Sequence, residues 1–476
     1  DLVVNHTSDE HPWFEEARKS RHNPYYNYYH WWPAEKGEPP LRLSYFDEEG
    51  NAWTYNKPTD SYYLHYFSRK QPDLNWENPE VRQEIFDMMR FWFDKGIDGF
   101  RMDSISLIAK DPSFPLIDSK KYPDIFSFYA KEPRLHLYLH EMNRQVLSKY
   151  DCMSVGEGSA VMVDDVAKFV DPAREELNML YHFDAARIRN TTLPDNPESG
   201  IDYSLIALKK MFTEWDKAVD KGWPSIYLGN HDQPRMVSRF GSDKDEFRAL
   251  YAKMLITFLL TMRGTPYWFA GDEIGMRNIR FDRIEDYNDI DTINRYKKAK
   301  AEGKDPQAVL DEQKETGRDN ARTPFQWDRS PEAGFTAGTP WLKVNPDYTW
   351  INVADEEKDP TSILNYFKKV VSFRKENPSL IYGSYHLLDA ENPQSYTFLR
   401  KTGADTYLIM LNFSPKAAIS TPGIDMSNAH VLLDNYGDRS HMAPQKDITL
   451  RPFEAIVFQL NHPVYESFID SLDLLE

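Results

Sequence analysis

The chain has 476 residues, of which 41% are hydrophobic and 14% aromatic, so it can bury a large core and form two or three domains. Its formal net charge of −18 argues against nucleic acid or an anionic membrane as a partner, because either would require a basic surface. A single cysteine excludes an internal disulfide, and no apolar run approaches the roughly 20 residues of a membrane helix. These bounds favour a globular protein with a small, neutral substrate.

The sequence opens on Asp1 inside a strand-like run, with neither an initiator methionine nor a signal peptide before it. We therefore expect the sequence to begin within a domain, where localisation signals would not be visible. A cytoplasmic location is favoured, while the periplasm and secretion stay open.

Residues 1–5 predict a strand, and the long stretch at 7–72 is rich in aromatics, prolines and polar residues. Few connections of that length lack structure, so we predict an inserted subdomain that carries substrate contacts. Residues 78–96 predict a helix with an Asn cap, Pro79 in the first turn and a terminal glycine. That helix leads into a strand at 99–103.

Strands and helices then alternate as far as residue 270, which predicts a parallel sheet with helical crossovers. Polar residues close several successive strands, so a (β/α)8 barrel fits better than an open sheet. Residues 274–341 are predicted to be an irregular loop, followed by a closing helix at 362–375. The remaining predicted strands lie at 153–157, 179–183, 225–230 and 266–270, and the predicted helices at 135–149, at 204–221 and within 246–263.

Short alternating runs begin near residue 382 and predict a C-terminal antiparallel β-domain. The predicted domains are therefore a catalytic barrel at 1–6 and 73–381, the inserted subdomain at 7–72, the β-domain at 382–461 and a short helical tail at 462–476. The chain is thus assigned to the α/β class.

Two motifs bear on cofactors and metals, and both give a negative result. Gly156-Glu-Gly158 lacks the third glycine of a dinucleotide fingerprint and places a carboxylate where a pyrophosphate would approach. The acidic run at 47–51 lacks the ligand spacing of a calcium loop and is predicted to be a solvated turn. No cofactor is therefore expected for the chemistry.

Carboxylates close two predicted strands at Asp103 and Glu157. Cleaving a glycosidic bond with retention needs an ionised nucleophile and a protonated acid about 5 Å apart. Arg101 lies two residues before Asp103 and shares its face of the strand, so its charge favours Asp103 as the ionised nucleophile. Glu157, partly desolvated at a strand end, is predicted to act first as general acid and then as base.

Asp232 closes a third strand, next to His231, and can stabilise an oxocarbenium-like transition state. His6, at the end of the first strand, offers another donor to a sugar. An isolated carboxylate at a strand end is more often a helix cap or a surface ion pair than a catalyst. Three of them on separate strands, with an arginine and histidines beside them, favour catalysis.

The chain resembles the α-amylase superfamily of glycoside hydrolases, family 13, and within it the oligo-1,6-glucosidase and α-glucosidase branch. The resemblance covers nearly the whole chain. It rests on the segments 1–6, 99–103, 156–157 and 230–232, which match the superfamily's active-site segments in order, and on the segments 71–75 and 318–328, which are typical of the glucosidase branch.

This resemblance implies a (β/α)8 TIM barrel with an inserted subdomain after the third strand and a C-terminal antiparallel β-domain. It also implies that the first two barrel strands, further subsite residues and a calcium-binding loop precede Asp1, so no metal ligand is assigned. The implied activity is that of a retaining, exo-acting α-glucosidase that removes glucose from the non-reducing end of short oligosaccharides. The implied roles are nucleophile for Asp103, acid/base for Glu157, transition-state stabiliser for Asp232, glucose binding for His6, Arg101 and His231, and closure of the pocket for Arg318.

Three alternatives stay open. Ser104 follows the nucleophile where α-1,6-specific relatives usually have Val. The expected specificity is therefore for α-1,4 bonds or for both α-1,4 and α-1,6 bonds. A sucrose isomerase or glucosyltransferase shares the same first step, since only the acceptor differs. A non-catalytic carbohydrate-binding or transporter-associated homologue is the third alternative. The oligomeric state is also open.

Overall fold

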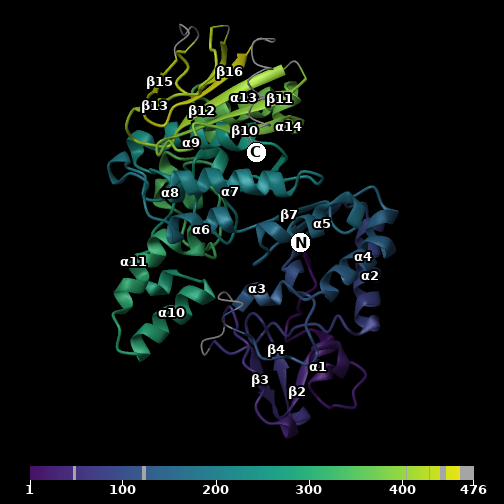
Figure 1. Ribbon diagram of the computed structural model, residues 1–476. Coiled ribbons are helices and arrows are strands. Elements are labelled where there is room, and N and C mark those ends of the chain that lie inside the picture. Colours follow the sequence, from purple (N-terminus) through teal and green to yellow (C-terminus); the bar gives the residue numbers. More distant parts are fainter. Residues whose placement is uncertain are drawn as a thin grey trace. The chain divides into compact units, whose positions relative to one another are not determined.

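The computed structural model describes residues 1–46, 50–118, 120, 125–403, 405–427, 429–439 and 446–460 (Figure 1). The predicted tail at 462–476 lies outside the described residues, as do residues 47–49 of the acidic run. The chain forms two compact units, one of residues 1–183 with 218–225 and one of residues 184–217 with the described residues from 226 onwards. None of the helices within the described ranges is long and apolar enough to cross a membrane.

The first unit is built on a parallel sheet in the order β1-β5-β6-β7. Its register places Val3 beside Asp103 and Glu157 beside Tyr181. Because the strands are parallel, their carboxyl ends lie at one edge of the sheet. The strands are β1 (Leu2–Val3), β5 (Gly99–Asp103), β6 (Met153–Glu157) and β7 (Met179–Tyr181). The bounds of β5 and β6 are as predicted, whereas β1 and β7 are shorter than the predicted strands at 1–5 and 179–183.

Helices precede β5 and β6, as the alternating pattern predicts. In α2 (Pro79–Asp94), the Asn78 side chain accepts a hydrogen bond from the Glu80 amide at 2.9 Å, which confirms the predicted cap. The apolar face of α2 is buried along its whole length. The other helices of this unit are α1 (Pro12–Ala17), α3 (Ile125–Tyr129), α4 (Arg134–Gln145) and α5 (Ala167–Val170).

A small antiparallel sheet, β2-β4-β3, lies within the segment predicted as an inserted subdomain. Its strands are β2 (Trp31–Pro33), β3 (Trp53–Asn56) and β4 (Ser61–Leu64). The ring of Phe14 packs edge-on against Tyr29 and Tyr63, with centroids 5.0 Å apart in both pairs. Aromatic packing therefore supplies this segment with a core of its own, while the domain bounds stay a prediction.

The second unit contains the remaining crossover helices. The Tyr267 amide donates to the Ile226 carbonyl at 2.8 Å where two short strands pair, so these strands exist but are shorter than predicted. The apolar helix α9 is buried along almost its whole length. The elements are α6 (Asp184–Thr191), α7 (Leu205–Ala218), β8 (Ser225–Ile226), α8 (Met236–Phe240), α9 (Asp245–Thr261), β9 (Thr265–Pro266), α12 (Val353–Glu356), α13 (Ile363–Glu376) and α14 (Ser379–Tyr382).

The prediction of an irregular loop at 274–341 is wrong over part of its length. Two helices, α10 (Ile290–Ala301) and α11 (Pro306–Thr316), form there, and each begins at an Asp cap. Their many charged residues hide the helical period, since only one narrow face packs against a small apolar cluster. The Asp-Pro pair that opens α11 is the signal that could have revealed it.

The C-terminal part of this unit is an antiparallel sheet in the order β10-β11-β12-β16-β14, accompanied by the pair β13-β15. Phe258 of α9 lies 5.3 Å from the ring of Tyr396 on β11, so the sheet packs on that helix. The predicted α/β class with a C-terminal antiparallel sheet is confirmed. The strands are β10 (Ser384–Leu388), β11 (Ser395–Thr402), β12 (Asp405–Asn412), β13 (Ala418–Ser420), β14 (His430–Asp434), β15 (Ile448–Leu450) and β16 (Ala455–Leu460).

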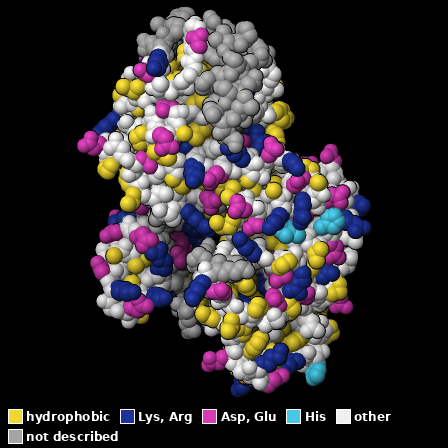
Figure 2. Space-filling view, in the orientation of Figure 1, with side chains coloured by type: hydrophobic (Ala, Val, Ile, Leu, Met, Phe, Trp, Pro, Cys, Tyr) yellow, Lys and Arg dark blue, Asp and Glu magenta, His cyan; other side chains and the backbone are white. Residues whose placement is uncertain are grey.

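Acidic and basic side chains are interspersed on the face that Figure 2 shows, rather than gathered by sign. A surface of this kind fits the sequence-based expectation of a neutral substrate.

Replacing Gly156 by Ala tests the close packing of β6. A Cβ there would lie 2.7 Å from Leu177 Cδ1 and 2.8 Å from Ile105 Cγ2, so the neighbours would have to move. We expect Gly156→Ala to destabilise the protein by about 1–3 kcal/mol, seen as a lower Tm in thermal denaturation. Gly338→Ala is the control, because an added Cβ there meets only Thr336 Oγ1 at 3.7 Å. Equal Tm values for the two variants would contradict this account of the sheet.

Candidate active site

Asp103 and Glu157 end the adjacent strands β5 and β6 and are bridged by one cation. Arg101 Nη1 donates to Asp103 Oδ1 at 2.6 Å, and Arg101 Nη2 donates to Glu157 Oε2. The Glu157 side chain is 9% exposed and that of Asp103 is 24% exposed. The structure therefore brings these two predicted carboxylates together, one more buried than the other.

Arg101 remains a cation in this setting. Burial disfavours its charge, but the attraction of Glu157, Tyr181 and Asp103 outweighs burial and raises the pKa of Arg101 above its ordinary value. The sequence-based argument took the arginine as the mark of the nucleophile. Since the same guanidinium contacts both carboxylates, this contact by itself does not distinguish nucleophile from acid.

Glu157 accepts hydrogen bonds on both of its oxygens. Ser159 Oγ donates to Oε1 at 2.9 Å, and the Ser104 amide lies 3.4 Å from Oε2. Ser104 is buried and adopts a left-handed backbone with φ of 46°, which turns the chain at the end of β5 and aims this amide at Glu157. Donors on both oxygens fix the direction of the Glu157 carboxyl group.

Sequence reasoning missed Tyr181, the last residue of β7. Its hydroxyl oxygen accepts hydrogen bonds from Arg101 Nε at 3.0 Å and from Nη2 at 2.6 Å. The strand predicted at 179–183 contains Tyr181, but its predicted end was Phe183, so Tyr181 was not marked as a strand-end residue. Recognising it required the register, which pairs Glu157 with Tyr181.

His6 is buried just after β1. Asn5 Nδ2 lies 3.2 Å from its Nδ1, and Gln71 Nε2 lies 3.0 Å from its Nε2. Burial lowers the pKa of His6, although Asp73 and Asp103 act in the opposite direction. The imidazole is therefore neutral at neutral pH, and it can exchange hydrogen bonds with a neutral ligand without adding a charge.

A fully buried ion pair is linked to His6 through Asn5. Lys110 Nζ lies 3.0 Å from Asp73 Oδ2, and neither side chain has any exposed surface. Lys110 also donates to Asn5 Oδ1 at 2.6 Å, and Asn5 in turn contacts His6. Burial lowers the pKa of Lys110 and the charge of Asp73 opposes that effect. The orientation of His6 thus depends on a pair of charges removed from water.

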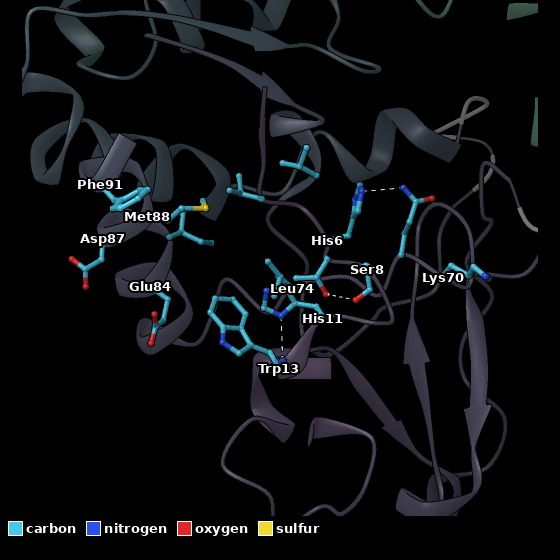
Figure 3. Close-up of a pocket in the computed structure, with 15 residues that line it drawn as sticks. His6, Ser8, His11, Trp13, Lys70, Leu74, Glu84, Asp87, Met88 and Phe91 are labelled. Atoms are coloured by element: carbon cyan, nitrogen blue, oxygen red, sulfur yellow. Dashed lines mark hydrogen bonds between the residues drawn. The ribbon is translucent and has the colours of Figure 1, made fainter. Parts of the chain in front are cut away.

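A cavity of about 820 Å³ lies beside β1 and α2 (Figure 3). Its walls are mostly apolar and include Val3, Met88 and Phe91, with Trp13 on another side. His6 lies at its margin, but neither Asp103 nor Glu157 lines it. The cavity is therefore not the space in which the two carboxylates converge.

In the second unit, the structure brings together the predicted residues His231, Asp232 and Arg318. Arg318 Nη1 lies 3.3 Å from Asp232 Oδ1, and His231 Nε2 lies 3.3 Å from Asp232 Oδ2. The Asp232 amide donates to Asn230 Oδ1 at 2.9 Å, so a local turn fixes the backbone of Asp232. Asp232 is thereby held at both its backbone and its carboxylate.

Two further residues of this cluster were missed, namely Arg322 and Asp289. Arg322 Nη2 donates to Asp232 Oδ1 at 2.8 Å. Arg318 Nη2 donates to Asp289 Oδ1, while the other oxygen of Asp289 caps α10 at Thr292. Burial disfavours the charge of Arg318, but Asp289 outweighs it and raises the pKa of Arg318. Arg322 lies four residues after the predicted site residue Arg318, so its position in the sequence could have indicated it. Nothing in the sequence indicated a site role for Asp289, which looks like an ordinary helix cap.

Metal ligation has no candidate in the part of the chain that the structure describes. Within the described ranges, no three His, Cys, Asp or Glu side chains are grouped so that they could hold an ion.

Comparisons with known proteins agree on one group of enzymes. A family model described as "Alpha amylase, catalytic domain" matches residues 1–383. Oligo-1,6-glucosidase from Parageobacillus thermoglucosidasius is 48% identical over 97% of this chain and 83% of its own length, and that from Bacillus cereus is 45% identical over 97% and 82%. A mutant isomaltulose synthase from Erwinia rhapontici, solved with D-glucose, has a TM-score of 0.90 at 40% identity and covers 97% of this chain and 82% of its own.

Replacing Lys110 by Met tests the buried ion pair. The change leaves the Asp73 charge buried and unpaired, and we expect a loss of about 3–5 kcal/mol in the free energy of unfolding, measured as a fall in Tm. Lys131→Met is the control, because Lys131 is 41% exposed and lies 3.4 Å from Asp165. An exposed pair contributes about 0–1 kcal/mol, so a similar fall in Tm for both variants would contradict the proposed support of His6.

Proposed function

The chain belongs to the alpha-amylase family, and from this premise we propose that it is a retaining, exo-acting α-glucosidase that removes glucose from short α-glucosides. It is a glycoside hydrolase whose catalytic domain is of the (β/α)8 barrel type. The observation that carries the proposal is the convergence of Asp103 and Glu157 on Arg101. Double displacement requires two acids that flank the same anomeric carbon, and the shared guanidinium holds these two close together.

In the first step, Asp103 attacks the anomeric carbon and Glu157 protonates the departing oxygen, which leaves a glucosyl ester on Asp103. Asp103 suits attack because it is the more exposed of the two carboxylates, and Arg101 Nη1 holds it in place at 2.6 Å. Glu157 suits proton transfer because it is the more buried. Its contacts with the Ser104 amide and the Ser159 hydroxyl fix its direction.

In the second step, Glu157 takes a proton from a water molecule, and the water oxygen attacks the anomeric carbon. The ester bond to Asp103 breaks and glucose leaves with its original anomeric configuration. Glu157 thereby regains the proton that it donated in the first step. The cycle needs no cofactor, because the two carboxylates supply both the nucleophile and the proton.

The other assignments follow the family's pattern residue by residue. Asp232 is assigned to stabilise the transition state, with His231 beside it. His6 and Arg101 are assigned to bind the glucose, His6 in its neutral form. Arg318 is assigned to close the pocket beyond the non-reducing end, which makes the enzyme release one glucose at a time.

A cytoplasmic location and a small-sugar substrate belong to the same proposal. The relatives named above are oligo-1,6-glucosidases, which fits a soluble sugar of a few units rather than a polymer. A structural calcium ion stays a prediction.

Replacing Asp103 by Asn is the direct test. It removes the nucleophilic charge and keeps the shape, so we expect turnover of p-nitrophenyl α-glucoside to fall by about a thousandfold or more. Asp98→Asn is the matched control, because Asp98 precedes the same strand and is exposed to solvent. A wild-type protein without turnover would favour the non-catalytic alternative, and full activity of the Asp103→Asn variant would exclude the assigned nucleophile.

Ser104 bears on which glucosidic bonds, α-1,4 or α-1,6, the enzyme cleaves. Relatives named oligo-1,6-glucosidase favour α-1,6 bonds, whereas the small side chain after the nucleophile differs from the Val of α-1,6-specific relatives. We propose that both α-1,4 and α-1,6 glucosides are cleaved, because a buried serine leaves room for either leaving group.

The Ser104→Val variant tests this reading. The added branch narrows the site, and we expect the ratio of the isomaltose rate to the maltose rate to rise severalfold. Val is strained at a φ of 46°, so a lower Tm is expected as well. The ratio of the two rates does not depend on the fraction of folded enzyme. Ser104→Ala is the control that removes the hydroxyl without adding bulk, and an unchanged ratio in the Val variant would refute the assignment.

A second candidate function is sucrose isomerisation. Similar solved structures include isomaltulose and trehalulose synthases at 37–40% identity with TM-scores of 0.88–0.90. Isomerases share the first step, and the released fructose then replaces water as the acceptor. Chromatography of the products from sucrose separates the two candidates, since hydrolysis gives glucose and fructose in equal amounts whereas isomerisation gives a new disaccharide.

A further inference from the structure

The guanidinium of Arg101 is held on two edges by different kinds of group. One N–H edge meets the two carboxylates, with Nη1 on Asp103 and Nη2 on Glu157. The other edge, Nε with Nη2, meets the hydroxyl oxygen of Tyr181 at 3.0 Å and 2.6 Å. Nη2 is therefore shared between a charged acceptor and a neutral one.

Tyr181 reaches this position through the sheet and not through a loop. It is the last residue of β7 and pairs in register with Glu157 on the neighbouring strand. The Arg101 guanidinium carbon lies 5.7 Å from the centre of the Tyr181 ring, so ring and cation are in contact as well. A group placed by strand pairing has a fixed direction, which suits a positioning role.

The neutral acceptor matters because Glu157 has two opposed requirements. It must carry a proton to act as an acid, yet each additional donor from Arg101 favours its ionised form. A phenol oxygen that occupies Nε and part of Nη2 limits how far the guanidinium turns toward Glu157. It leaves Nη1 to orient Asp103.

We propose that the Tyr181 hydroxyl is a positioning group that holds one edge of Arg101, so that this cation orients Asp103 without committing Glu157 to its carboxylate form. The inference rests on the proposed function and extends it by one residue. Tyr181 acts through Arg101 and is not itself assigned a contact with the reacting atoms.

Other charged or titratable groups of the same unit lie near this pair. Asp103, on β5, contacts the same Arg101 guanidinium as Glu157, on β6. The charge of Asp103 raises the pKa of His6, but burial lowers it by more and keeps His6 neutral. Asp1 Oδ2 lies 3.6 Å from Arg101 Nη1, on the side of Asp103. Tyr181 is the group that faces Glu157 from β7. The Tyr181→Phe change removes one oxygen and alters none of these charges.

The test compares two substrates whose leaving groups need different help. The leaving group of maltose is a sugar alkoxide, which depends on protonation, whereas p-nitrophenolate leaves readily without it. In Tyr181→Phe, Arg101 turns further toward Glu157, so we expect kcat/KM for maltose to fall about tenfold, within the range of general acid catalysis. The value for p-nitrophenyl α-glucoside is expected to stay within about twofold, since its departure bypasses the acid.

The pH profile gives a second readout that a purely structural role would not change. Greater attraction from Arg101 favours ionised Glu157, so the acid form is lost at a lower pH. We therefore expect the basic limb of the maltose profile to move to lower pH, by about half a unit to one unit for a hydrogen bond of this kind.

Tyr63→Phe is the matched control, because its hydroxyl donates to the Arg69 carbonyl at 2.8 Å in the same unit, and Tyr63 lies on the β2-β4-β3 sheet rather than on the sheet of Arg101. That variant is expected to show neither the substrate split nor the pH shift. Equal losses on both substrates, or no loss on either, in Tyr181→Phe would overturn the inference while leaving the proposed function intact. A wild-type enzyme inactive on both substrates would overturn both.

Discussion

The parallel register of β1, β5, β6 and β7 is the constraint on which the first unit's site depends. Side chains alternate along a strand, and parallel strands end at the same edge, so one register fixes which side chains meet. A shift of one residue would turn Asp103 or Glu157 toward the opposite face. The pairing of Glu157 with Tyr181 brings a phenol to the arginine that the two carboxylates share. Chemistry at this edge is therefore decided by backbone hydrogen bonds, before any side chain forms a contact.

Both units solve the same electrostatic problem in the same way. Carboxylates held close together repel each other, and an arginine between them offsets that repulsion. In the first unit Arg101 lies between Asp103 and Glu157, and in the second Arg318 lies between Asp232 and Asp289. The fork of the guanidinium also fixes direction, since each N–H points at one acceptor.

The buried pair of Lys110 and Asp73 serves a different purpose. Burying two charges costs about as much free energy as their attraction returns, so such a pair contributes little to stability unless a partner is lost. What it provides is a fixed network, in which Lys110 holds Asn5 and Asn5 holds His6.

The sequence by itself determined the ends of β5 and β6, the capped helix α2, the C-terminal sheet and the catalytic candidates Asp103, Glu157 and Asp232, because all of these are local patterns of period, cap and polarity. Only the tertiary structure revealed the partners, since Tyr181 is far along the chain from Arg101, and Asp289 looks in the sequence like any helix cap. Helices α10 and α11 were not predicted, because their charged surfaces show little hydrophobic periodicity. The packing of one narrow face of each helix stabilises them. Local sequence fixes which face a side chain takes, whereas the partner on that face is set by the pairing of distant segments.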